Sequence, residues 1–116
     1  MRINENIPPR TFAVGLRNQT TISDCGDIHL EPNESVTFVT GDHSRLDFAR
    51  KDWGFYATPS VNKRLVNEGF KTAIVKNLAG AVYIMVVKTN QMERFYQYLD
   101  EDKQEVIQWL DTIPLD

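Results

Sequence analysis

The chain is poor in the residues that build covalent and metal-centred sites. It has one cysteine, Cys25, in 116 residues, so neither an internal disulfide nor a zinc site of several cysteines can form. Its six glycines stand singly and never form a Gly-rich loop before a helix. The sequence therefore excludes a disulfide scaffold and contains no phosphate-binding motif.

Long hydrophobic runs are also missing. The longest apolar run, residues 81–87, is far shorter than the roughly 20 residues needed to span a bilayer. Residues 1–10 include arginine, glutamate, asparagine and two prolines, and they lack the apolar core of a secretory signal. We therefore expect no membrane association and a location in the cytoplasm, where a lone cysteine stays reduced.

The charges are unevenly distributed. The net charge is −3, yet residues 45–76 hold seven Lys or Arg against three acids, while residues 89–116 hold two against seven. Such regions are typical of solvated faces that keep a protein soluble. The negative total and the absence of an RNA-binding pattern argue against nucleic acid as a partner.

Hydrophobic residues make up 41% and charged residues 25% of the chain, which is the composition of a folded protein. We expect a single domain over residues 1–116, with residues 1–9 as a flexible tail. Period-2 alternation, as in Phe12, Val14 and Leu16, dominates the first half of this domain. It predicts an N-terminal β-meander over the first 40 residues, with strands at 11–16, 20–24, 28–31 and 36–39. A fifth strand is predicted at 45–50, and extended chain continues through residue 56.

Turn and helix signals divide the rest of the chain. A reverse turn is predicted at residues 31–34 because Pro32 and Asn33 suit its central positions. A helix is predicted at residues 59–68, with Thr58 as its cap and Gly69 as its stop. Residues 72–75 and 82–87 predict a hairpin that is apolar on both faces, which favours a central place in the sheet.

The acidic C-terminal segment carries an apolar stripe at helical spacing. Asn90 can cap a helix in which Met92, Phe95 and Leu99 share one face. Val106, Trp109 and Leu110 repeat the pattern, but a capping signal at Asp100 predicts a break. The predicted fold is therefore α+β: a bent, mostly antiparallel sheet of about seven strands, covered by one helix near 59–68 and two C-terminal helices.

Metal-assisted or nucleophilic chemistry has weak candidates. Asp27 and His29 are two residues apart in a predicted strand, and His43 lies in a nearby loop, so the three side chains could bind zinc or iron. Cys25 is flanked by two aspartates, which disfavour the thiolate that a nucleophile needs. The alternative for each of these residues is an exposed polar position on the meander.

One segment combines three features of binding sites. Aromatic side chains run into a predicted helix N-terminus that is followed by basic residues, an arrangement suited to anions or sugars. The candidate ligand-binding residues are Trp53, Tyr56, Thr58, Ser60, Lys63 and Arg64. The alternative is that the aromatic residues belong to the core and the basic residues are solvated.

The absence of a catalytic constellation favours a non-catalytic binding or accessory protein without a cofactor. Its expected ligand is an anionic or sugar-containing small molecule or a partner protein. Two alternatives stay open: a small metal-assisted enzyme that uses Asp27, His29 and His43, and a homo-oligomeric structural protein that pairs through a sheet edge or the outer side of the last helix.

Overall fold

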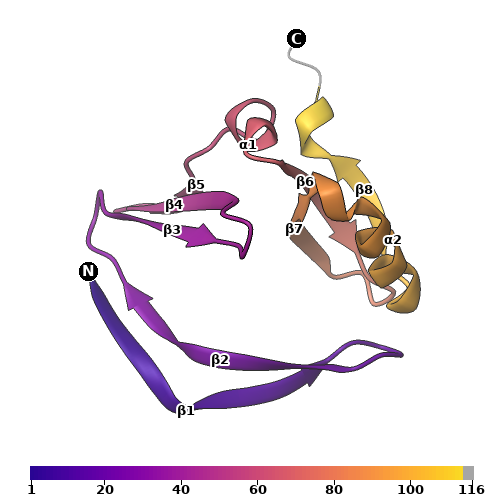
Figure 1. Ribbon diagram of the computed structural model, residues 1–116, viewed down its shortest axis with the longest axis horizontal. Helices are drawn as coiled ribbons and strands as arrows, with labels where there is room; N and C mark the ends of the chain where they lie inside the picture. Colours follow the sequence, from indigo (N-terminus) through magenta and orange to yellow (C-terminus); the bar gives the residue numbers. More distant parts are fainter. Residues whose placement is uncertain (114–116) are drawn as a thin grey trace.

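Neighbouring strands pair locally and form three small antiparallel sheets in the computed structural model, which describes residues 1–113 (Figure 1). The sheet orders are β1-β2, β3-β4-β5 and β7-β6-β8. The α+β class is confirmed, but the single sheet of about seven strands is wrong. The strands are β1 (Arg2–Val14), β2 (Thr20–His29), β3 (Ser35–Val39), β4 (Arg45–Lys51), β5 (Gly54–Ala57), β6 (Phe70–Lys76), β7 (Val82–Lys88) and β8 (Glu105–Trp109).

The first sheet is a long hairpin, and it corrects two predictions. Residues 2–9 belong to strand β1 instead of a flexible tail, and β2 runs continuously through Gly26, where a strand end was expected. Gly26 has φ +146°, and a Cβ there would collide with the carbonyl oxygen of Asn4. This glycine therefore marks a close backbone approach beside the register shift between Glu5 and Arg10, not the end of a strand.

The predicted turn at residues 31–34 is present. The amide of Glu34 donates to the carbonyl oxygen of Glu31 at 3.1 Å, and Asn33 has φ +70°. It does not join two paired strands of a meander, however, because β3 pairs with β4 and not with β2. The turn leads from the hairpin into the second sheet, whose third strand is β5.

The predicted helix at 59–68 ends correctly but starts too early. Helix α1 covers Arg64–Asn67, and Gly69 follows it with φ +91°. The preceding residues form turns in which Ser60 accepts hydrogen bonds at its carbonyl oxygen from the amides of Lys63 and Leu65. Leu65, which is fully buried, attaches this short helix to the rest of the fold.

Strands β6, β7 and β8 and helix α2 (Met92–Glu101) form a C-terminal unit that holds the main core. Helix α2 confirms the first predicted C-terminal helix and packs across one face of the β7-β6-β8 sheet. Lys103, with φ +52°, and a hydrogen bond of 2.9 Å from the Gln104 amide to the Leu99 carbonyl oxygen end the helix. The core cluster consists of Ala73, Val75 and Leu99, with Met85, Phe95, Val106 and Trp109 packed against it.

The second predicted C-terminal helix is wrong, because the segment is strand β8 followed by the 3-10 turn η2 (Leu110–Thr112). Val106 lies opposite Val75, and Trp109 lies opposite Ala73, across a register shift that adds one residue to β8. The added residue lets two positions three apart point to the same face. A bulged strand thus produced the spacing that predicts a helix.

A few polar contacts join the three sheets. The N-terminal ammonium pairs with Glu34 at 3.2 Å, and the amide of Leu16 at the hairpin tip donates to Asp102 at 2.9 Å. Asp42, in the β3–β4 turn, pairs with Lys88 at the end of β7. Figure 1 shows the hairpin as an arm along one side of the molecule, reaching from the second sheet to the C-terminal unit.

The arrangement is open. The radius of gyration is 15.9 Å, whereas a compact domain of this length has about 13.4 Å. None of the helices in residues 1–113 has both the length and the apolar character needed to cross a membrane.

Candidate functional site

The predicted aromatic site lies on the surface. Trp53, in the β4–β5 turn, is 70% exposed, and its ring stacks on the ring of Tyr56 with 6.0 Å between centroids. Phe55 is exposed as well. The alternative that placed these aromatic residues in the core therefore does not hold, and the stacked pair forms an accessible aromatic platform.

Three polar residues of the predicted site are engaged with their own chain: Thr58, Ser60 and Arg64. Arg64 donates from Nη2 to the Thr58 hydroxyl at 3.3 Å and lies 3.7 Å from the Asp47 carboxylate. The Ser60 hydroxyl accepts the Arg64 amide at 3.0 Å. Lys63 is exposed just before α1, but a helix of four residues lacks the dipole and the array of free amides that bind an anion. The aromatic pair and the exposed Lys63 are therefore the parts of this site that these hydrogen bonds do not engage.

The metal candidates do not come together. His29 lies at the end of β2, where its Nε2 is 3.2 Å from the Asn4 amide nitrogen, and Asp27 pairs with Asn4 in the ladder. His43 sits in the β3–β4 turn, in a different sheet. Within residues 1–113 no three His, Cys, Asp or Glu side chains form a group able to hold a metal ion. Cys25 is exposed, and its thiol contacts the Ser23 carbonyl oxygen.

A cavity of about 510 Å³ lies where the hairpin tip meets the C-terminal unit. Its polar groups include Tyr98 and Asp102, and burial, followed by the nearby Asp102 carboxylate, raises the pKa of the Tyr98 hydroxyl. The apolar lining comes from both sides of the junction: Val14, Leu16, Ile22, Leu78, Tyr83 and Met85. The hairpin tip therefore touches the C-terminal unit without packing closely against it.

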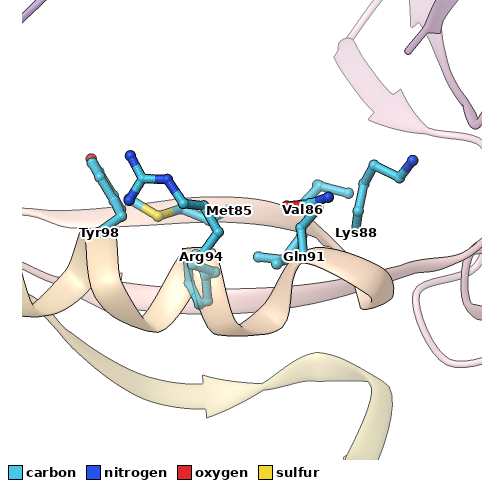
Figure 2. Close-up of a pocket in the computed structure, with 8 residues that line it drawn as sticks. Met85, Val86, Lys88, Gln91, Arg94 and Tyr98 are labelled. Carbon is cyan, nitrogen blue, oxygen red and sulfur yellow. The ribbon is translucent and has the colours of Figure 1, made fainter. Parts of the chain in front are cut away.

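A second hollow, of about 450 Å³, runs between β7 and α2. Figure 2 shows the residues that line it: Arg94 and Tyr98 of α2, Gln91 just before this helix, and Met85, Val86 and Lys88 of β7. Met85 and Tyr98 also line the cavity at the hairpin tip, so the two hollows adjoin. Together the two hollows follow β7 from Tyr83 to Lys88.

Large apolar side chains are exposed on all three sheets. Ile84 of β7 is 72% exposed and Ile107 of β8 is 52% exposed. Others in this group are Ile3, Ile7 and Ile28 of the hairpin, Phe38 and Val39 of β3, and Val82 and Tyr83 of β7. The exposed side of β7 was missed from the sequence, although the pattern of a strand that is apolar on both faces had been recognised.

No protein-family model matches the chain, and neither a curated protein nor a solved structure is significantly similar to it.

Proposed function

We propose that this chain is a non-catalytic structural subunit that assembles with further copies of itself. The supporting observation is its surface. The chain exposes 8337 Å², whereas a compact monomer of 13.4 kDa exposes about 6,500 Å². The excess of about 1,800 Å² falls within the roughly 1,000–2,500 Å² that each copy buries in an obligate homodimer.

The small core also supports self-assembly. Within residues 1–113 the buried hydrophobic residues are few: Ala49, Leu65, Phe70, Ala73, Val75, Val87 and Leu99. Many larger apolar side chains stay in solvent on sheets of two or three strands. Because a sheet normally buries its apolar face against another layer, the layers that would cover these faces are best supplied by neighbouring copies.

The hairpin arm supports assembly as well. An isolated two-stranded hairpin is at best marginally stable in water. Here β1 and β2 pair with each other and carry exposed isoleucines, while single polar contacts at Met1 and Leu16 link the arm to the rest of the chain. Contacts with a second copy would stabilise an arm of this kind.

Size-exclusion chromatography with light scattering tests this proposal. The purified chain should elute with a mass that is an integer multiple, two or more, of 13.4 kDa. A monomer mass at every loading concentration would refute self-assembly.

A second candidate function is the binding of a sugar-containing ligand at the Trp53–Tyr56 pair. It is favoured by the exposed, stacked rings, because aromatic faces are common platforms for sugars. Titration with mono- and oligosaccharides should shift the NMR signals of the Trp53 indole and the Tyr56 ring. If these signals stay in place while the rest of the spectrum confirms a folded protein, this candidate is lost.

A further inference from the structure

Strand β7 has the composition of a central strand but lies at an edge. Residues 82–87, Val-Tyr-Ile-Met-Val-Val, contain no charge, glycine or proline. Met85 and Val87 point toward α2, while Val82, Ile84 and Val86 point to the opposite face. Strands that are apolar on both faces are typical of sheet interiors. Yet within residues 1–113 the pairing of β7 is with β6 alone.

The other edge strands have features that discourage further pairing. Strand β1 contains Pro8 and Pro9, and its partner β2 contains two aspartates and a glycine. Strand β8 has a glutamate and an added residue that breaks its register. Strands β3 and β5 are short, with five and four residues. Natural edge strands use such charges, prolines, bulges and short lengths to avoid pairing with another chain. The seven-residue β7 has only Lys88, at its end.

Strand β7 is exposed over its first half: Val82 is 56%, Tyr83 46% and Ile84 72% exposed. The groove of about 450 Å³ between β7 and α2 follows Met85 to Lys88 (Figure 2). Lys88 already pairs with Asp42 of its own chain, so its charge is partly neutralised. An incoming apolar strand would meet no unpaired charge on β7 itself.

From these observations we infer that β7 pairs edge to edge with β7 of a second copy, in antiparallel orientation about a two-fold axis. This inference rests on the proposed self-assembly and names its surface. The two sheets join in the order β8-β6-β7-β7-β6-β8, and both β7 strands become central. A second copy suits this edge because antiparallel self-pairing places no two like charges opposite each other within residues 82–87.

A cysteine scan tests the pairing directly. In such a two-fold pair, one residue lies opposite its own copy, with the Cα atoms about 4.5–5.5 Å apart, within the range of a disulfide. Single cysteines are introduced at positions 83, 84, 85 and 86 in a Cys25→Ser background, which removes the exposed native thiol. Mild oxidation should give one maximum of covalent dimer within these positions and little at the neighbouring residues. The control is Ile107→Cys, which is 52% exposed at the opposite edge of the same sheet.

A charge on the strand gives an independent test. Ile84→Asp should convert the assembly to a form of at most half the mass, because each copy would bring an aspartate into the joined strands. The control variant, Ile107→Asp, should leave the mass unchanged. Circular dichroism confirms that both variants are folded. If wild type is assembled but the scan has no maximum on β7 and Ile84→Asp keeps the full mass, the pairing is refuted and self-assembly stands. A monomeric wild type refutes both the pairing and self-assembly. This is also the result expected if β7 instead receives a strand of a different protein.

Discussion

Ile74 and Ile84 lie directly opposite each other in the β6–β7 ladder, on the face of the sheet that α2 does not cover. Their neighbours Ala73 and Val75 are completely buried under α2. The same sheet therefore has one face packed under α2 and an opposite face that is buried at Phe70 and Thr72 but exposed at Val82 and Ile84. This asymmetry underlies the proposal that the isolated chain is one part of a larger assembly.

Gly26→Ala should destabilise the hairpin. The substitution forces a side chain into a left-handed conformation and against the Asn4 carbonyl group, so we expect a loss of about 1–3 kcal/mol. The matched control is Gly41→Ala, where no atom lies within 4 Å of the added Cβ, and its effect should stay within about 0.5 kcal/mol. Urea unfolding followed by circular dichroism measures both. Equal stability of the two variants would contradict the close approach at Gly26.

Trp53→Ala should leave the free energy of unfolding within about 0.5 kcal/mol of wild type, because the ring is exposed. A tryptophan in the core would cost about 3–5 kcal/mol on truncation. The unfolding midpoint in urea separates the two cases. A loss of the larger size would mean that the ring is buried in solution, and it would remove the basis for a sugar site there.

Asp24 should titrate below its ordinary pKa of 3.8. The hydrogen bond from Arg10 is the main cause, and the Gly26 amide also lowers the pKa of this carboxyl. Because the folded-state pKa is depressed, the stabilisation is present above pH 3.8 and is lost as the pH falls through the folded-state value.

An NMR titration of the side-chain carboxyl carbons measures this effect. Arg10→Gln should raise the pKa of Asp24 toward 3.8. Glu34 serves as an internal control, because the Glu31 amide and the N-terminal ammonium lower its pKa and neither is changed. An Asp24 pKa that is the same with and without Arg10 would show that the contact is absent in solution.

Local signals in the sequence were sufficient for several elements. The turn at Pro32–Asn33, the helix stop at Gly69 and helix α2 with its Phe95–Leu99 face were all predicted from turn chemistry, glycine and period-3.6 spacing. Each of these signals acts over a few residues.

Features that depend on distant contacts could not be read from the sequence. The three-residue spacing of Val106 and Trp109 fits a helix, and only pairing with β6 makes it a bulged strand. The N-terminal residues carry no clear alternation, and their pairing with β2 makes them a strand.

The candidate site was only partly predictable for the same reason. The sequence singled out Trp53 and Tyr56, but it did not indicate that Asp47 pairs with Arg64. It also indicated that β7 belongs inside a sheet, although the isolated chain places β7 at an edge. Pairing with a second copy would give β7 the central position that its composition indicates.

Sedimentation equilibrium of the wild-type chain tests self-assembly most directly, because it measures mass without assuming a shape. We predict a single species of twice 13.4 kDa, or a higher multiple, that dissociates only on strong dilution. A mass of 13.4 kDa that does not change with concentration would contradict the account.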